Sequence, residues 1–484
     1  MNASWLLAPL ALFGSLAPAA RPGPGPVPPG FRGTLVDSVS VLRAPALPRP
    51  HYLETFTDPV FGTRITRITG EPGTPVGPGL GVWGTDARHV YSKQQPWNSD
   101  GTLLSIENRK GGATRSPVIL DGETYRPRYT PCDAFDNYEY RWHPSPKYPT
   151  VQIAVNRAGT ELMWFDVATC RKLRSWTLPF PADYGIGSSE GNVSADGRYV
   201  VISDDTRMVV VDMDPQGPNT PPWPHRRIGP VYTFVPCSLK TGDPDFCPNG
   251  NISISPSGRY IDLKFGSGGA PCDTTCDLHR VFSVDAALVI RPHPLAGSSL
   301  RCGSFAARPN GWTFPLKHAD MARDPFDGNE DVLIGGRACP GSRIGRVVKV
   351  RLRDGKVTAL SDPDNEASFW HASARNTLRP GWVYVTYARG PATAGRRFAG
   401  EIVAVKMDGS GTVQRFGHVR TSGKPYRAEA HGVPSPDGRR VIFASDWTDD
   451  CTGDCGSTGV FGGYVIDARD RAGPASRSRD ARRP

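Results

Sequence analysis

The sequence lacks long segments with the periodicity of an amphipathic helix, and only 21% of its 484 residues are charged. Both features argue against a helical protein. Glycine and proline are frequent instead, with 54 and 48 residues, and turn-forming segments separate short apolar runs. This pattern predicts an all-β protein. The chain is long enough to bury a large core.

No segment has the length of a transmembrane helix. The N-terminal apolar run at residues 5–17 is too short to span a bilayer comfortably, and Ala17-Pro18-Ala19 resembles a small-residue cleavage site. The Lys or Arg that usually precedes such a run is missing. We expect residues 1–20 to be a signal peptide and the protein to be secreted or periplasmic. The alternative is an apolar N-terminal strand.

The sequence also lacks the motifs of several functional classes. It has no nucleic-acid-binding motif and no interleaved aromatic and basic residues, so no nucleic-acid partner is expected. It has no GxSxG motif and no paired carboxylates in a glycosidase-like context, so a hydrolase lacks support. The net charge of +10 favours an acidic partner, although residues 471–484 supply several of these charges and read as a disordered tail.

Ten cysteines are present, an even number that favours disulfides in an exported protein. The pairs close in sequence are Cys237 with Cys247, Cys272 with Cys276, Cys302 with Cys339, and Cys451 with Cys455, which leaves Cys132 and Cys170. The alternative is zinc, because CDTTCDLH offers Cys272, Cys276 and His279. This spacing is not one of the strong zinc patterns.

One short unit recurs along the chain. In HGVPSPDGRRVIFASDW (431–447) a first strand leads into a turn at residues 435–438, and a β-branched, apolar strand follows at 439–444. Related units are PWNSDGTLLSIEN (96–108), NVSADGRYVVISDD (192–205) and NISISPSGRYIDLKF (251–265), with looser versions at 142–156, 324–336 and 376–388. Several units are followed by a second pair of strand-like runs.

Four short strands per unit, repeated at roughly 45 to 70 residues, are typical of a β-propeller. We expect seven blades, or eight if residues 266–313 contain another. Because each blade buries its faces only against its neighbours, the ring must close. The alternating segment FGTRITRIT (61–69) is predicted to complete the last blade as an outer strand. The expected segments are a signal peptide (1–20), a Pro/Gly-rich linker and N-terminal extension (21–56), the propeller domain (57–468) and a basic disordered tail (469–484).

In a propeller blade the first strand lines the central channel, and its start lies at the face where ligands usually bind. Six residues before the second turn residue, the clear units carry Gln94, Glu190, Asn251 and His431. The looser units carry Arg141 and His143, His318 and Asp320, and His371 on the corresponding strands. Such groups can bind an anion or a metal and move a proton, so we expect a functional site at one mouth of the channel. The alternative is a polar ring bridged by ordered water.

Five segments resemble those of secreted β-propeller polysaccharide lyases, the ulvan lyase and oligogalacturonate lyase group. They are YSKQQPWNSDG, SADGRYV, KHADMARDPFDGNE, WHASARNTLRPGW and AHGVPSPDGRRVIFASDW, and the likeness spans most of residues 57–468. The resemblance implies β-elimination in an acidic, uronate-containing polysaccharide or oligosaccharide. It implies no organic cofactor, and an arginine or a divalent metal to neutralise the carboxylate. We expect a monomer. The alternative is a non-catalytic, TolB-like propeller, extracellular or periplasmic, that binds a glycan or a protein.

The resemblance also suggests roles for the polar residues. Arg141 or Arg198 would neutralise the carboxylate, and His143, with Tyr184 as the alternative, would transfer the proton. Arg198 can instead be a surface residue beside a turn, and Tyr184 a packed loop aromatic. The expected metal ligands are His318, Glu429 and His431; oligogalacturonate lyases carry a histidine where Glu429 stands and a glutamine where Tyr426 stands. The expected substrate-binding residues are Gln94, Glu190, Asn251, His371 and Trp447.

Overall fold

The computed structural model describes residues 34–111, 117–129, 137–213, 227–233, 248–265, 277–293, 313–337, 347–361, 365–390 and 393–469. These segments form 28 β-strands and a short 3-10 helix, η3 (Tyr426–Ala428), and none of their residues is in an α-helix. The predicted all-β class is confirmed. No helix of the described residues has both the length and the apolar character needed to cross a membrane.

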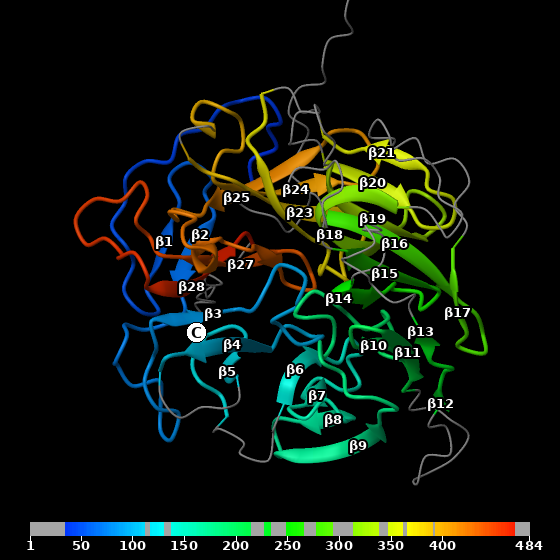
Figure 1. The fold of residues 1–484 in the computed structure, drawn as a ribbon. Helices are drawn as coiled ribbons and strands as arrows, with labels where there is room; N and C mark the ends of the chain where they lie inside the picture. The colour runs from blue at the N-terminus through cyan, green and yellow to red at the C-terminus, as the bar shows by residue number, and fades with distance from the viewer. Residues whose placement is uncertain are drawn as a thin grey trace, which may run out of the picture.

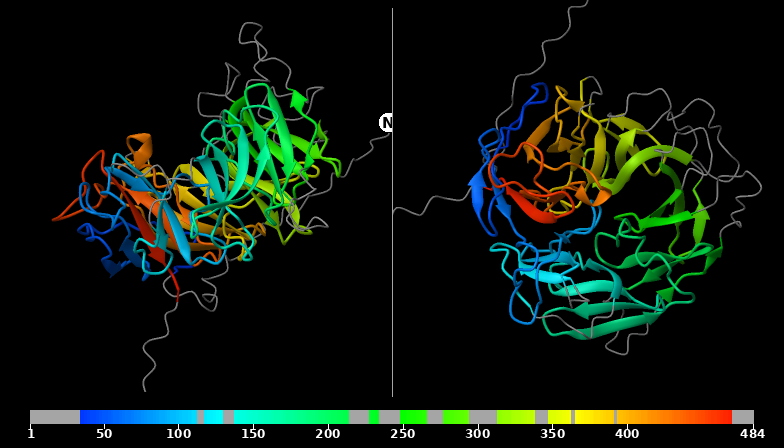
Figure 2. Two further views of the ribbon diagram at one scale, coloured as in Figure 1. Left: turned by 90° about the horizontal axis from the view of Figure 1, so that it is seen from below. Right: turned by 60° about the vertical axis from the view of Figure 1, so that its left-hand side comes forward.

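The strands form sheets that follow one another in chain order around a central axis (Figure 1). Figure 2 shows the same succession from two other directions. The first groups are β3 (Asp86–Arg88), β4 (Leu103–Arg109) and β5 (Val118–Asp121); β6 (Asn137–Trp142), β7 (Val151–Asn156), β8 (Glu161–Asp166) and β9 (Arg171–Thr177); and β10 (Tyr199–Ser203), β11 (Arg207–Asp212), β12 (Arg227–Ile228) and β13 (Tyr232–Thr233).

The next groups are β14 (Pro248–Ile254), β15 (Tyr260–Phe265), β16 (Asp277–Val284) and β17 (Ile290–Pro292); β18 (Thr313–Asp324), β19 (Glu330–Arg337), β20 (Val347–Arg351) and β21 (Val357–Ala359); and β22 (Phe369–Ser373), β23 (Trp382–Tyr387), β24 (Glu401–Lys406) and β25 (Val413–His418). The last comprises β26 (Val433–Pro434), β27 (Arg440–Ser445) and β28 (Phe461–Asp467), together with β1 (Thr55–Thr57) and β2 (Arg64–Arg67). Most sequential strands within a group pair antiparallel, as in hairpins, whereas β12 and β13 both pair with β11.

The N-terminal and C-terminal parts of the chain share one sheet. Strand β2 pairs antiparallel with β28, and the register runs from Arg64 opposite Asp467 to Arg67 opposite Tyr464. The guanidinium of Arg64 also lies 2.6 Å from the carboxylate of Asp467. The alternating segment at 61–69 therefore pairs with the last strand of the chain.

The apolar core lies between neighbouring groups. Ile153 and Trp164 of one group pack with Val200 and Val209 of the next, and all four are fully buried. Since these strands alternate between two covered faces, both faces of a sheet carry β-branched and aromatic residues. Stability therefore depends on contacts between sheets as much as on pairing within them.

The repeated turn has the geometry that its residues predict. Asp437 accepts a hydrogen bond of 3.2 Å from the backbone N–H of Arg439, and Gly438 has a φ of 68°. The matching glycines of two other units, Gly197 and Gly258, have φ angles of 75° and 76°. Positive φ is accessible to glycine without the steric cost that a side chain brings.

These turn glycines also make room for the neighbouring group. A β-carbon on Gly438 would lie 2.5 Å from the hydroxyl oxygen of Tyr384, a residue of β23 in the preceding group. A β-carbon on Gly258 would lie 2.5 Å from the ring of Tyr199, at the start of β10. The turn of one group is thus packed directly on a side chain of the group before it.

Residues 34–50, part of the expected linker and extension, contact the outer side of the last groups. Arg397 donates to the carbonyl of Ser38 over 2.6 Å, and Arg415 donates to the carbonyl of Ser40 over 2.8 Å. Arginine side chains therefore hold this segment by its backbone rather than by its sequence.

The disulfide Cys451–Cys455 is present, with a Cα–Cα distance of 5.7 Å, and it confirms one expected pair. Cys170 is also disulfide-bonded. The remaining cysteines of the sequence prediction lie outside the described residues: Cys132, Cys237, Cys247, Cys272, Cys276, Cys302 and Cys339. His279, named with two of them as an alternative zinc ligand, lies 2.9 Å from a carboxylate oxygen of Asp262.

We expect Gly438→Ala to destabilise the protein more than Gly411→Ala, measured by urea unfolding. Both glycines have positive φ, but a β-carbon at Gly411 meets no atom within 4 Å. Gly411→Ala should cost about 1 kcal/mol of unfolding free energy from backbone strain alone. Gly438→Ala should cost roughly 1–3 kcal/mol more because Tyr384 must move. Equal losses would show that the contact with Tyr384 does not matter.

Candidate functional site

The inner strands of several groups carry irregularities near their polar residues. Register shifts occur at Asn137/Glu139 in β6, Pro248/Ile252 in β14, Lys317/Asp320 in β18 and Phe369/His371 in β22. His318 and His431 have positive φ angles of 44° and 47°. A bulge re-aims the side chains beside it, and such backbone strain persists only where the surroundings enforce it. These irregularities place histidines from separate groups next to one another.

Three histidines and a tyrosine form one aromatic cluster. The ring centroids of His371 and His431 are 4.2 Å apart, and those of His318 and His371 are 4.4 Å apart. The ring of Tyr91 lies 4.8 Å from His431 and 5.4 Å from His371. The Tyr91 hydroxyl is 2.9 Å from Nδ1 of His318. The cluster therefore joins the loop after β3 to β18, β22 and the segment before β26.

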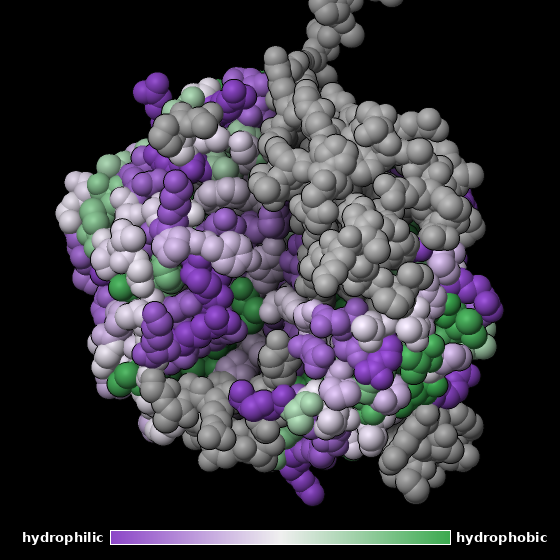
Figure 3. All heavy atoms as spheres, in the orientation of Figure 1, coloured by the Kyte–Doolittle hydropathy of each residue, from purple (hydrophilic) through white to green (hydrophobic). Residues whose placement is uncertain are grey.

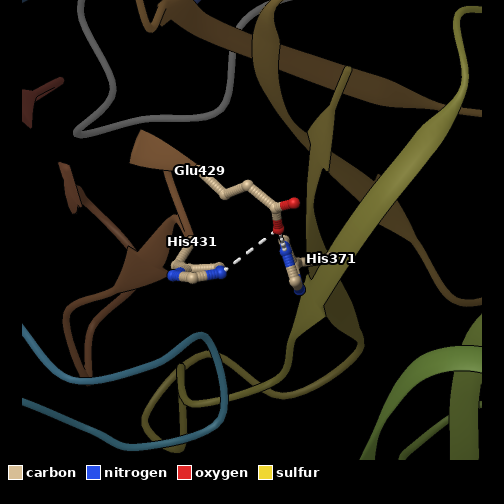
Figure 4. Close-up of side chains that lie close together, drawn as sticks. All are labelled: His371, Glu429 and His431. Carbon is tan, nitrogen blue, oxygen red and sulfur yellow. Dashed lines mark hydrogen bonds and ion pairs between the residues drawn. The ribbon is translucent and has the colours of Figure 1, made fainter. Parts of the chain in front are cut away.

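Glu429 lies between two of these imidazoles (Figure 4). Its Oε2 is 2.7 Å from Nε2 of His371 and 3.5 Å from Nε2 of His431. A carboxylate only accepts, so Nε2 of His371 carries the proton and Nδ1 holds the lone pair. The side chain of Glu429 is 21% exposed, whereas that of His371 is 1% exposed. The carboxylate thus sets the tautomer of a buried imidazole.

The imidazoles of the cluster are held neutral. Burial, followed by the charges of His371 and nearby lysines, keeps the pKa of His318 well below its usual value. Burial also lowers the pKa of His371, although the hydrogen bond to Glu429 opposes this, and it lowers that of His431 further. Neutral imidazoles can accept a proton or ligate a metal.

Strand β3 supplies an arginine to the same place. Nη1 of Arg88 lies 2.8 Å from Nδ1 of His431, and Arg88 is fully buried. His89, the next residue, donates from Nε2 to the carbonyl of His431 over 2.7 Å if that nitrogen carries its proton. Burial, then the charge of Arg88, lowers the pKa of His89 to about 3, so His89 is neutral. Residue 431 is therefore held through both its ring and its backbone.

A second cluster contains two lysines around Glu190. Lys93 and Lys264 both bond to its carboxylate, the latter over 3.1 Å, and Nδ2 of Asn251 donates to it over 2.9 Å. Burial opposes ionisation of Glu190, but the two lysines outweigh it and lower its pKa to about 2. Two of the predicted substrate-binding residues, Glu190 and Asn251, are therefore in direct contact.

Over β3 and β4, hydrophilic residues gather on the surface of one face (Figure 3).

Arg141 is engaged with the protein itself. Its guanidinium donates to the carbonyls of Tyr140, Ile186 and Gly191 over 2.6 to 2.8 Å, and to the carboxylate of Glu139 over 2.6 Å. The side chain is only 3% exposed. Arg141 thus anchors the loop at residues 186–191, and the arrangement does not support the suggested role in neutralising a substrate carboxylate.

His143 lies at the turn end of its strand, opposite the end that carries the clustered histidines in other groups. Inner strands run from the clustered histidines toward the repeated turn, and His143 follows the last residue of β6. Its ring packs 4.5 Å from that of Trp164, and a β-carbon on Gly197 would lie 2.5 Å from it. Burial lowers its pKa to about 4. The structure does not bring His143 to the histidine cluster; it lies under a turn of the next group.

A cavity of about 140 Å³ lies at this turn side of the inner strands. Arg141, His143, Ser194, Arg323 and Arg375 are among the residues that line it. None of the clustered histidines does. The sequence-predicted polar residues are therefore divided between two places rather than gathered at one mouth.

The remaining predicted residues have other partners. Tyr184 donates to Asp205, which raises the pKa of its phenol to about 12. Arg198 forms a two-point ion pair with Asp212, at 2.8 and 2.9 Å, on the surface beside its turn. The ion pair of Arg198 matches the alternative of a surface residue beside a turn, whereas Tyr184 is partly exposed rather than packed.

Three further predicted residues are buried. Trp447 is fully buried, and its ring stacks 4.8 Å from that of Tyr464, so it offers no face to a sugar. Gln94 is also buried and donates to the carbonyl of Tyr140 over 3.0 Å. Asp320 binds Arg375 in a pair at 2.9 Å. All three stabilise contacts within the propeller rather than an open site.

The sequence-based assignment missed Tyr91, Lys93, Lys264 and Arg88. Tyr91 and Lys93 stand in YSKQQPWNSDG, one of the segments used for the resemblance, yet they precede the position reached by counting back from the turn. Lys264 lies on a second strand, β15, which the counting rule did not consider. Lys264 is a charged residue among the apolar residues of that strand, and this was the sequence signal that could have identified it.

The donor atoms of His371, Glu429 and His431 lie within 4.8 Å of one another, a grouping that could hold a metal ion. Two imidazoles and a carboxylate suit several divalent transition metals. Of the expected ligand set, Glu429 and His431 are included, and His371 stands in place of His318. One contact opposes ligation. A guanidinium only donates, so Nδ1 of His431 must accept from Arg88, and the proton of the neutral ring stays on Nε2. The residues in this arrangement do not fit a metal at His431.

No model of a known protein family matches the sequence, and no curated protein matches it. Two solved structures are similar over most of the chain. An oligogalacturonate lyase in complex with manganese has a TM-score of 0.51 and 13% identity, over 88% of this chain and 99% of that one. The oligogalacturonate lyase of Vibrio parahaemolyticus has a TM-score of 0.50 and 13% identity, over 87% and 98%. At 13% identity the likeness to these two structures shows the fold alone.

The contact between Arg88 and His431 predicts how the site responds to a metal. In Arg88→Met protein, Nδ1 of His431 can carry the ring proton and Nε2 becomes a ligand. We expect this variant to bind Mn²⁺ at least about 10-fold more tightly than the wild type in isothermal titration calorimetry, a typical size for an outer-shell effect. The double variant Arg88→Met/His431→Gln keeps the charge change and should lose the gain. Equal Mn²⁺ affinity in wild type and Arg88→Met would contradict the assigned tautomer.

Proposed function

We propose that the protein is a secreted or periplasmic lyase that cleaves an acidic, uronate-containing polysaccharide or oligosaccharide by β-elimination. We further propose that it has seven blades and that β2 closes the ring. The observation that carries the proposal is the contact of 2.9 Å between the Tyr91 hydroxyl and His318, inside a cluster of neutral imidazoles. Similarity to oligogalacturonate lyases over most of the chain supports it.

The reaction removes the C5 proton of a uronate, forms the C4–C5 double bond and expels the glycosidic oxygen from C4. It needs a base, an acid and a cation beside the carboxylate. His318 is the proposed base, since it is neutral and less buried than His371 and His431. In the tautomer that donates from Nδ1 to Tyr91, its Nε2 is the ring nitrogen that accepts the proton.

Tyr91 is the proposed acid. Its hydroxyl gives a proton to the departing oxygen and regains one from Nδ1 of His318, so the pair ends with its protons redistributed and none lost. Three further residues position this pair. The rings of His371 and His431 pack against Tyr91, and the carboxylate of Glu429 fixes the tautomer of His371. None of these steps passes through a bound metal.

The proposed location outside the cytoplasm rests on the cysteines and on the apolar run at residues 5–17. The Cys451–Cys455 bond and the bonded Cys170 support it, because disulfides persist in oxidising compartments. The pairing of β2 with β28 supports ring closure, since it joins both ends of the domain in one sheet.

The test is absorbance of the unsaturated uronate product with pectate, ulvan and glycosaminoglycans as substrates. We expect product from at least one of them, and a loss in kcat of about 100-fold or more for Tyr91→Phe and for His318→Gln. Tyr184→Phe is the matched control and should retain wild-type kcat, because among the described residues this hydroxyl bonds Asp205 alone.

Absence of product on every substrate, with and without divalent metal, would refute the lyase. If a uronate polymer binds without being cleaved, and binding survives in His318→Gln, the non-catalytic propeller is the correct reading. A kcat for Tyr91→Phe equal to that of Tyr184→Phe would refute the role of Tyr91 alone.

A further inference from the structure

We propose that Lys93 is the group that binds the sugar carboxylate, with Lys264 beside it and Glu190 orienting both. This inference rests on the proposed function and deepens it, because it assigns the cation that β-elimination requires to the protein itself. Lys93 stands two residues after Tyr91, the proposed acid, on the same loop after β3.

A hydrogen bond to Glu190 holds the ammonium of Lys93 in place, and the side chain is shielded from solvent. Its ammonium bonds to Oε2 of Glu190, while Lys264 and Asn251 bond to Oε1 of the same carboxylate. The side chains of Lys93 and Lys264 are 6% and 8% exposed. An ammonium has three donors, and Glu190 takes one from Lys93. A pre-oriented, buried ammonium is a stronger partner for a carboxylate than a solvated surface lysine.

The cluster acts electrostatically on the proposed reacting groups. The charges of Lys264, Lys317 and Lys93 all act on His318, and Glu190 acts on His371 and Tyr426. Glu190 takes one of the three donors of the Lys93 ammonium. A buried ammonium binds an anionic sugar more strongly than a neutral one.

A purely structural role would differ in one respect. A structural ion pair is weakened by removing either partner, so Lys93→Met and Glu190→Gln should then act alike. In a carboxylate subsite the two changes have opposite signs, because Glu190→Gln removes a competing negative charge while the amide oxygen still accepts from the lysines.

The experiment measures binding of D-galacturonate and D-glucuronate by ligand-observed NMR, with D-galactose as the uncharged probe. These monosaccharides have no glycosidic bond to cleave, so the result is independent of turnover. We expect Lys93→Met to weaken binding of an acidic sugar by about 10-fold, the loss of one charged hydrogen bond. Glu190→Gln should bind it at least as tightly as the wild type. Lys172→Met, which breaks a Lys–Glu pair on the outer strand β9, is the matched control and should change nothing.

Lys93→Met leaves the Glu190 carboxylate with one lysine fewer, which could disturb folding. The double variant Lys93→Met/Glu190→Gln removes the charge of that carboxylate. It should be folded and should also bind the acidic sugar about 10-fold more weakly than the wild type. The proposal is overturned if neither acidic sugar binds the wild type more tightly than galactose does. It is also overturned if Lys93→Met and Lys93→Met/Glu190→Gln bind like the wild type, or if Glu190→Gln weakens binding as much as Lys93→Met. A lyase that is active in the absorbance assay yet gives these results would have its carboxylate subsite elsewhere.

Discussion

The packing of repeated turns on the sheet before them, seen at Gly197, Gly258 and Gly438, is the constraint on which the rest of the structure depends. A glycine at positive φ has no β-carbon, and a tyrosine of the preceding group occupies the space where one would lie. Tyr384 does so at Gly438, and Tyr199 does so at Gly258. Because the contact links consecutive groups, it sets their spacing around the axis. The same spacing brings the starts of the inner strands together at the opposite end.

The histidine cluster is a consequence of this arrangement and of local backbone irregularity. His318 and His371 stand beside register shifts in β18 and β22, and His431 adopts a positive φ. Regular strands alternate their side chains, and a bulge is the usual way to change where one of them points. Glu429 fixes His371 by accepting a hydrogen bond from its ring, and Arg88 fixes His431 by donating one to its ring. Chemistry at this site therefore depends on tautomers that neighbouring side chains impose.

Charge divides the site into two parts with different functions. Around the imidazoles, burial keeps the rings neutral and therefore able to exchange a proton. Around Glu190, the lysines keep a buried carboxylate ionised. A neutral proton-transfer pair beside a fixed positive group is what removal of a proton next to a carboxylate needs.

The sequence by itself determined the all-β class and the turn units, because turn residues and alternation act over a few residues. It also pointed to His318, His371, Glu429 and His431 as neighbours. Only the tertiary structure decided that Arg141 and His143 lie away from this cluster, that Tyr91 belongs to it, and that Lys93 bonds Glu190 in a second cluster. The reason is geometric: a residue's offset from a turn gives its height along a strand, whereas its direction depends on bulges and on the side chains of other sheets.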